Sequence, residues 1–120
     1  DGFGSFWWNS VSKLNSGRPH LIEIYNCTRV EVFNISLRDS AFWTLHPVYS
    51  RDVWIHDVEI SAPDWALNTD GIDPDSSENV LIERCTISVG DDGIAIKSGL
   101  DAAGRAMGMP CRNISIKNCT

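Results

Sequence analysis

The sequence predicts an all-β protein built as a parallel β-helix, a solenoid in which each coil of the chain stacks on the previous one. A short strand pattern recurs along the chain, at offsets of 23, 27 and 34 residues. Gly, Pro, Asn, Asp and Ser gather between the copies, as turns require. No segment has apolar residues at helical spacing over three turns. The length of 120 residues, with 42% hydrophobic and 22% charged residues, fits one ordered unit.

The repeated pattern describes a strand, a bend and a second short strand. Its four copies begin at Val30, Val53, Val80 and Ile114. Each copy has apolar residues at its first, third and sixth positions, and the first three copies add an eighth. The first and third positions alternate with polar or exposed neighbours, which is typical of a half-buried strand. The alternation breaks between the third and sixth positions, so we expect a bend there.

Other repeat architectures fit this pattern poorly. A leucine-rich repeat would show Leu-x-x-Leu-x-Leu, and propeller blades need about 40–50 residues each. In a parallel β-helix the unequal offsets become loops of unequal length, and the longest is expected from Lys97 to Arg112. One coil cannot bury its own interior, so about five coils without caps would be marginally stable. We therefore expect residues 1–120 to be part of a single, longer β-helix domain that continues beyond both ends.

Charge and cysteine content exclude several classes of protein. A net charge of −6 argues against a nucleic-acid partner. No uncharged apolar stretch approaches the roughly 18 residues that span a bilayer, so no membrane partner is expected. The four cysteines form no Cys-x-x-Cys pair, which argues against a zinc ribbon. Four Asn residues begin N-glycosylation sequons and predict a secreted glycoprotein: Asn26, Asn34, Asn113 and Asn118.

The repeat also constrains the cysteines. Cys85 and Cys119 occupy the same position in successive copies, so their Cα atoms should lie within the roughly 4.4–6.8 Å of a disulfide. A bridge and a reduced, buried ladder both remain open. Cys27 and Cys111 share another position but lie three copies apart, roughly 14 Å, and cannot bridge each other.

Three carboxylates are the strongest chemical signal. Asp-Gly-Ile occurs at Asp70 and Asp92, and the offset of 22 residues is one coil. The two should therefore stack on one face, with Asp91 beside them. Adjacent residues of a regular strand point to opposite faces, so a bend at Gly90 and Gly93 is needed to turn Asp91 and Asp92 the same way. The alternative is that these are simply turn residues.

Carboxylates at this distance repel one another, and the repulsion raises at least one pKa. Bound calcium, protonation or a nearby cation would relieve it. Glycosidic bond cleavage needs one protonated and one ionised carboxyl, about 6.5–9.5 Å apart in an inverting enzyme. We expect Asp91 to be the general acid, and Asp70 and Asp92 to activate water.

Other side chains are expected to bind substrate. His46 and Asp73 share a register position, judged by the prolines that follow them, and should face the groove one coil apart. Both are expected to contact sugar hydroxyls. Lys97 is expected to pair with a substrate carboxylate, although a solvated charge at a strand end is the alternative. Asn68 is expected in the same region, where it would orient Asp70 or complete a turn.

At these residues the sequence resembles the polygalacturonases, the pectin-degrading glycoside hydrolases of family 28. The motifs that match are Asn68-Thr69-Asp70-Gly71, Gly90-Asp91-Asp92 and Ile94-Ala95-Ile96-Lys97-Ser98-Gly99, with Arg18-Pro19-His20 and Phe42-Trp43-Thr44-Leu45-His46-Pro47 upstream. The resemblance implies a right-handed β-helix and inverting hydrolysis of α-1,4-galacturonosidic bonds. It implies Asp91 as the general acid, with Asp70 and Asp92 activating water.

The resemblance also implies a polysaccharide partner, homogalacturonan or a related pectin, and a secreted monomer that acts on the cell wall without cofactor or metal. The family uses further Gly-His-Gly and Arg-x-Lys motifs, which this sequence lacks. We therefore expect residues 1–120 alone to be inactive. Two alternatives stay open: a pectate lyase, which would need calcium, and a non-catalytic β-helix that binds polysaccharide.

Overall fold

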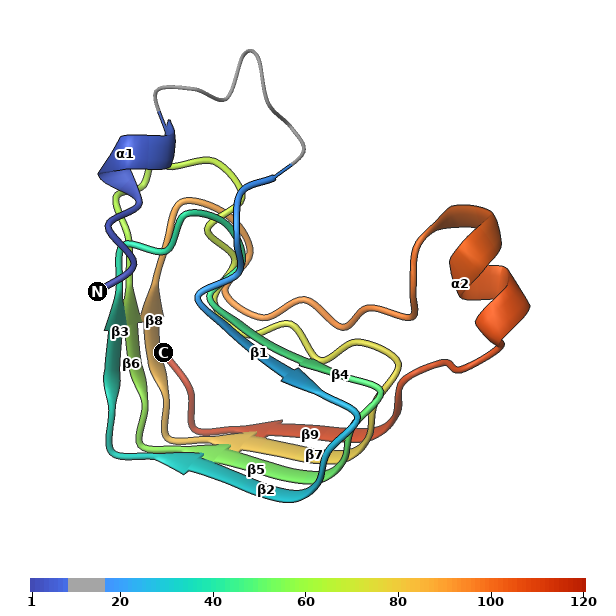
Figure 1. Cartoon of the computed structure of the whole chain (residues 1–120). Coiled ribbons are helices and arrows are strands. Elements are labelled where there is room, and N and C mark those ends of the chain that lie inside the picture. Colours follow the sequence, from blue (N-terminus) through green and yellow to red (C-terminus); the bar gives the residue numbers. More distant parts are fainter. Residues whose placement is uncertain (9–16) are drawn as a thin grey trace.

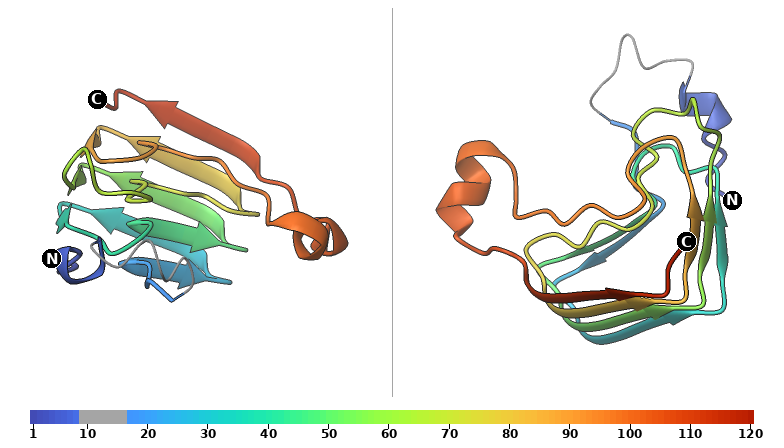
Figure 2. Two further views of the ribbon diagram at one scale, coloured as in Figure 1. Left: turned by 90° about the horizontal axis from the view of Figure 1, so that it is seen from above. Right: turned by 180° about the vertical axis from the view of Figure 1, so that it is seen from behind.

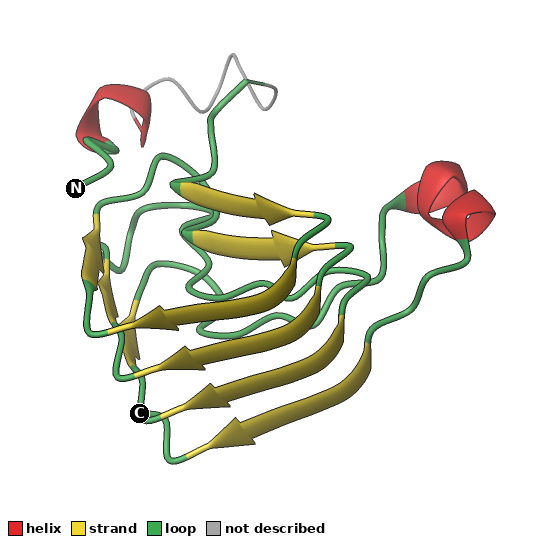
Figure 3. Cartoon of the chain, turned by 60° about the horizontal axis from the view of Figure 1, so that its bottom comes forward, coloured by secondary structure: helices red, strands yellow, loops and turns green. Residues whose placement is uncertain are grey.

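The computed structural model describes residues 1–8 and 17–120, which form a parallel β-helix with three faces (Figure 1). The first face holds β1 (Ile22–Tyr25) and β4 (Leu45–Val48). The second face holds the strands β2 (Thr28–Phe33), β5 (Arg51–His56), β7 (Glu78–Glu83) and β9 (Arg112–Lys117). The third face holds the strands β3 (Ser36–Arg38), β6 (Glu59–Ser61) and β8 (Thr86–Ser88). All paired strands are parallel (Figure 3).

The first face continues beyond its two strands as single bridges. Leu45 pairs with Ile72 and Ile72 with Ile94, and Asp75 pairs with Lys97. The second face has the most strands, four, so the described residues make four coils, where about five were expected. The difference lies at the amino end, where the described residues add only part of a coil. There the Gly2 amide donates to the Arg38 carbonyl at 2.8 Å, just before the short helix α1 (Ser5–Trp8).

The register on the second face is the one that the repeat predicted. Val53 pairs with Val30 on one side and Val80 on the other, and Val80 pairs with Ile114. The inner coils are closed to solvent, with Ile55 and Ile82 fully buried, whereas Ile116 in the last coil is 45% exposed. The same apolar position is thus buried only when a coil lies on both sides of it, as Figure 2 shows for the stack. Stacking, not the single coil, makes the core.

Each coil turns its corners with residues of positive φ. The bend expected inside the repeat falls at its fifth position, where φ is 52° or 53° in every copy: Asn34, Asp57, Arg84 and Asn118. All four sequon asparagines have φ of 52°, and all are exposed. Asn is one of the few residues that tolerate this left-handed conformation. The corner geometry therefore explains why Asn recurs, and glycosylation stays a prediction.

The cysteines are free thiols. Cys85 and Cys119 stack one coil apart as predicted, and the structure shows the reduced alternative. Burial raises the pKa of the Cys85 thiol, which donates to the Glu83 carbonyl at 3.4 Å. Such a thiol packs as a small apolar side chain.

The long insertion expected after Lys97 is present, and it contains the helix α2 (Asp101–Met107). The sequence did not predict this helix. It has only seven residues and none is buried, so it shows no apolar stripe. It ends at Gly108, whose φ of 60° closes the last turn. None of the helices that the structure describes is long and apolar enough to cross a membrane.

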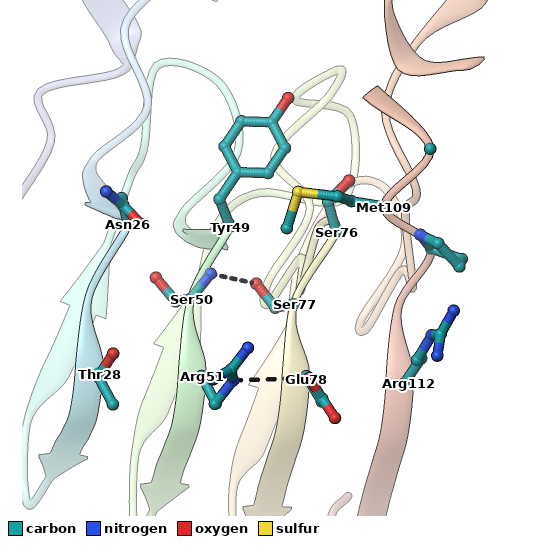
Figure 4. A pocket seen from close by; sticks show the side chains of 12 residues that line it. Asn26, Thr28, Tyr49, Ser50, Arg51, Ser76, Ser77, Glu78, Met109 and Arg112 are labelled. Carbon is teal, nitrogen blue, oxygen red and sulfur yellow. Dashed lines mark hydrogen bonds and ion pairs between the residues drawn. The ribbon is translucent and has the colours of Figure 1, made fainter. Parts of the chain in front are cut away.

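The insertion returns against the corner between the first and second faces and forms a pocket there. The pocket has a volume of about 380 Å³ and is lined by Tyr49, Arg51, Met109 and neighbouring residues (Figure 4). Its floor is a ladder in which the Ser50 amide donates to Ser77 Oγ at 3.0 Å. None of the three clustered carboxylates lines this pocket, so it is separate from the catalytic candidates.

Candidate active site

Asp70, Asp91 and Asp92 meet on the first face, beyond β4. The Gly71 amide donates to the Asp92 carbonyl at 2.9 Å, which places Asp70 and Asp92 in adjacent coils. One carboxylate oxygen from each of the three aspartates lies within 4.8 Å of the others. The structure thus brings together the three residues that the motifs singled out.

The bend at Gly90 turns both neighbouring aspartates outward. Asp91 and Asp92 are both exposed, although they are adjacent in sequence. Gly90 is needed for this path, since a Cβ there would lie 2.4 Å from the Ala66 carbonyl oxygen. The Asp92 amide also donates to Asp91 Oδ1 at 3.0 Å, which fixes the turn.

The close approach of these groups has a local cause: Asp91 and Asp92 share one turn, and Asp70 is only one coil away. The 4.8 Å refers to one oxygen of each residue and is not the separation of whole carboxyl groups. The roughly 6.5–9.5 Å separation of an inverting enzyme therefore stays a prediction.

Lys97 faces the protein's own carboxylates. Its Nζ lies 3.2 Å from Asp70 Oδ2, 3.5 Å from Asp73 Oδ1 and 4.1 Å from the centroid of the Trp43 ring. Asp70 and Asp73 thus hold the Lys97 ammonium in this structure, and its pairing with a substrate carboxylate stays a prediction. Burial raises the pKa of Asp70, and the Lys97 charge opposes that rise.

His46 and Asp73 stack one coil apart, as the register of Leu45 with Ile72 requires. Neither is open to a sugar, since Asp73 is fully buried and His46 is 6% exposed. The expectation that both contact sugar hydroxyls is therefore not supported by their placement. Asp73 is placed to hold Lys97, while His46 faces Glu23 and His20.

Asn68 was expected to orient Asp70 or to complete a turn, and in the structure it makes a turn and contacts Asp91. Its backbone amide donates to Asp91 Oδ2 at 3.1 Å, and its side-chain Nδ2 lies 3.4 Å from the same oxygen. Its Oδ1 accepts from Arg18 Nη2 at 2.6 Å. The positive φ of Asn68, 61°, shows that it also makes a turn. Both of its polar side-chain atoms are thus occupied within the protein.

Arg18 was not among the predicted site residues. Its guanidinium spans the space between coils and also donates to the Ala41 carbonyl at 3.1 Å and the Leu67 carbonyl at 2.9 Å. The only sequence signal was its place in a motif shared with the family, because no repeat or spacing connects it to Asp91. We interpret Arg18 as a residue that positions the acid through Asn68.

Asp73 should make stability depend on pH. Burial, and then the Asp70 charge, raise its pKa from an ordinary value of 3.8 to about 7. Between those pH values the folded protein holds a proton that the unfolded chain has lost, so the free energy of unfolding falls as the pH rises. Asp73→Asn should remove this loss and stabilise the protein near pH 7.5 by about 1–3 kcal/mol, since each pKa unit is worth about 1.4 kcal/mol.

Urea unfolding at about pH 4.5 and about pH 7.5 measures this effect. Asp64→Asn, at an exposed position, is the matched control and should leave the pH dependence unchanged. Equal pH dependence in the Asp73→Asn variant and the unmodified protein would contradict the prediction.

The comparisons with known proteins agree with this site. The model for glycosyl hydrolases family 28 matches residues 1–120. The chain is 44% identical to a probable polygalacturonase of Vitis vinifera over 100% of its length, and 39% identical to an endo-polygalacturonase of Pectobacterium carotovorum subsp. carotovorum over 92%. These matches cover 25% and 27% of the two relatives.

A solved structure agrees as well. The crystal structure of a hyperthermoactive exopolygalacturonase from Thermotoga maritima superposes with a TM-score of 0.83 at 40% identity. It covers 89% of this chain and 24% of the other. The chain thus spans about a quarter of the length of the relatives that it matches. With the family model matched from end to end and its carboxylate motifs gathered on one face, the chain belongs to glycosyl hydrolases family 28.

Proposed function

We propose that this chain forms the catalytic face of a polygalacturonase, which hydrolyses α-1,4-galacturonosidic bonds in homogalacturonan or a related pectin with inversion. The observation that carries the proposal is the cluster of Asp70, Asp91 and Asp92, with one oxygen of each within 4.8 Å of the others. A structural protein gains nothing from three carboxylates at this distance, because their repulsion costs stability. A hydrolase uses them as acid and base.

The three carboxylates differ in environment, which suits them to different roles. Asp91 is exposed and its Oδ2 accepts from the Asn68 amide, which supports the role of proton donor to the leaving oxygen. Asp70 is 4% exposed, and burial raises its pKa, while the charge of Lys97, which donates to its Oδ2, opposes that rise. A raised pKa makes a carboxylate a stronger base, which suits Asp70 to take a proton from water. Asp92 lies in the coil next to Asp70, so the pair can hold one water between two acceptors.

Inversion is proposed from the environment of Asp70. A retaining enzyme needs a carboxylate that reaches the anomeric carbon itself. Asp70 is too buried to reach that carbon, and its ion pair with Lys97 holds its carboxylate in place. A water held by Asp70 and Asp92 reaches the carbon instead, which makes a direct displacement with inversion.

The acidic substrate requires cationic side chains near the cleavage site, and the described residues place few of them there. Among the described residues, Lys97 is the cation in contact with the carboxylate cluster, and Asp70 and Asp73 already hold it. The net charge of −6 also repels a polygalacturonate chain. We therefore propose that binding depends on parts of the protein outside residues 1–120.

The reaction can be tested on the protein purified at its natural length. With polygalacturonate, reducing ends should appear without calcium and in the presence of a chelator. Proton NMR of the first product should show the β anomer. The α anomer would overturn inversion while leaving hydrolysis intact. An unsaturated product that needs calcium would identify a lyase, and the absence of any cleavage would favour a polysaccharide-binding β-helix.

We also propose that the protein is a secreted monomer that works in the cell wall. The four sequons support this, since their asparagines lie at exposed corners. Enzymatic removal of N-glycans from the native protein should lower its mass. An unchanged mass would contradict glycosylation.

Replacing Arg18 with Lys should lower kcat about tenfold and leave KM nearly unchanged. An ammonium cannot reproduce the three hydrogen bonds of the guanidinium, so Asn68 and Asp91 lose their fixed orientation. Steady-state kinetics on polygalacturonate measures both constants. Arg38→Lys, at the exposed end of β3, should change neither. A rise in KM alone would show that Arg18 binds substrate and does not position the acid.

A further inference from the structure

A second group of chemically active side chains lies on the first face, in the two coils that precede the coil of Asp70. His20 Nδ1 lies 2.8 Å from Glu23 Oε2, and His46 Nδ1 lies 3.4 Å from the same oxygen. The two Nδ1 atoms are 3.2 Å apart. The fold creates this group because β1 pairs Glu23 with His46 of β4 (Figure 1).

These three donor atoms form the face of a tetrahedron. Zinc binds imidazole nitrogen and carboxylate oxygen at about 2.0–2.2 Å, so neighbouring donors of a tetrahedral site lie roughly 3.3–3.5 Å apart. The separations of 2.8, 3.2 and 3.4 Å require little movement to meet this geometry. We propose that His20, Glu23 and His46 form a binding site for a divalent transition-metal ion of the zinc class, with a fourth position open to water.

His46 is prepared for this role by its surroundings. It is 6% exposed, and its other ring nitrogen, Nε2, has no hydrogen-bond partner but lies 3.5 Å from Asp75 Oδ2. A carboxylate behind a ligating imidazole is the usual outer partner of a metal-bound histidine. Asp75 is itself fixed, because its Oδ1 accepts from the Gly99 amide at 2.7 Å.

His20 is also held in place. Its ring stacks on Trp43 with centroids 5.0 Å apart and an interplanar angle of 3°. This contact fixes the ring plane, while Nδ1 faces Glu23. The open side of the group is at Glu23, whose side chain is 46% exposed, so an ion can enter there.

The site is separate from the catalytic carboxylates. The Trp43 ring lies between the two groups, because it stacks on His20 and also lies 4.1 Å from Lys97 Nζ, which contacts Asp70. The two groups also differ in chemistry. Nitrogen donors select zinc, cobalt or nickel, whereas an all-carboxylate group suits calcium or magnesium.

His56 provides a matched control within the same chain. It also contacts two carboxylates, but through opposite ring nitrogens: Nδ1 lies 2.6 Å from Asp57 Oδ2 and Nε2 lies 3.0 Å from Glu31 Oε1. Its donors therefore do not converge on one point. The His56 group and the proposed site thus both combine histidine with carboxylates, and they differ in whether the donor atoms converge.

The test uses cobalt(II) as a spectroscopic probe on the chelator-treated protein at its natural length. One equivalent of cobalt should give visible d–d absorption, and zinc should abolish it. His20→Ala and Glu23→Gln should each weaken binding at least about 100-fold, beyond the roughly 10–100-fold of an outer partner. Two variants are used because both positions are partly exposed and should fold, whereas His46 is buried.

His56→Ala and Asp91→Asn should bind cobalt as the unmodified protein does, and near-ultraviolet circular dichroism should confirm that every variant is folded. Absence of cobalt absorption, or unchanged binding in the folded His20→Ala and Glu23→Gln variants, would overturn the site. Loss of binding in Asp91→Asn would place the ion at the catalytic carboxylates and would also overturn it. None of these readouts depends on cleavage of pectin.

Discussion

Replacing Asp91 with Asn should lower kcat on polygalacturonate by about 10²–10⁴-fold, the usual contribution of a general acid. The amide has the shape of the carboxyl but cannot transfer a proton to the leaving oxygen. Because Asp91 is exposed, the change removes no core packing and the variant should fold. Reducing-end release by the protein at its natural length measures the effect.

The control for this prediction is Asp101→Asn. Asp101 is an exposed aspartate of α2, so Asp101→Asn removes the same negative charge outside the cluster of Asp70, Asp91 and Asp92. It should leave kcat within about twofold, whereas Asp91→Asn should not. A non-catalytic, polysaccharide-binding β-helix would tolerate both substitutions in a binding assay. Full activity in Asp91→Asn would therefore remove Asp91 from the acid role.

The stacking of coils could be predicted from the sequence because register in a solenoid follows the apolar pattern. Val53 and Val80 pair as aligned, and the bend falls where the alternation breaks. The helix α2 could not be predicted in this way, since it is exposed on all sides and has no apolar face. Local strand patterns predict the parts of a β-helix that touch other coils, and not its loops.

The candidate site shows the same division. The one-coil offset of Asp70 and Asp92 predicted their proximity, which the structure confirms. Side-chain partners could not be predicted, because they depend on directions that no spacing encodes. Lys97 turns toward Asp70, and Asn68 toward Asp91. Arg18 reaches Asn68 across 50 residues, which no local pattern indicates.

Replacing Gly71 with Ala should destabilise the protein by about 3 kcal/mol or more, at or above the upper end of the usual cost of overpacking. A Cβ at Gly71 would lie 2.5 Å from the Gly93 carbonyl oxygen and 2.6 Å from Ile87 Cγ2. Because the first of these is a backbone atom of the next coil, the coils themselves must separate. Urea unfolding measures the loss of stability.

The same change should lower kcat by about 10²-fold, since a misplacement of roughly 1 Å has that effect in a preorganised site. Separating the coils stretches the hydrogen bond from the Gly71 amide to the Asp92 carbonyl, which sets Asp70 beside Asp92. The two aspartates then no longer hold one water between them.

Gly93→Ala is the matched control, because Gly93 occupies the same place in the second Asp-Gly-Ile motif. A Cβ there would meet only Ile87 Cγ2 at 3.8 Å, an ordinary contact, and neither glycine has a positive φ. Gly93→Ala should therefore change stability by no more than about 0.5 kcal/mol and leave kcat nearly unchanged. Equal effects of the two substitutions would show that glycine serves both positions through chain flexibility, and that the close approach of the coils does not set the geometry of the carboxylates.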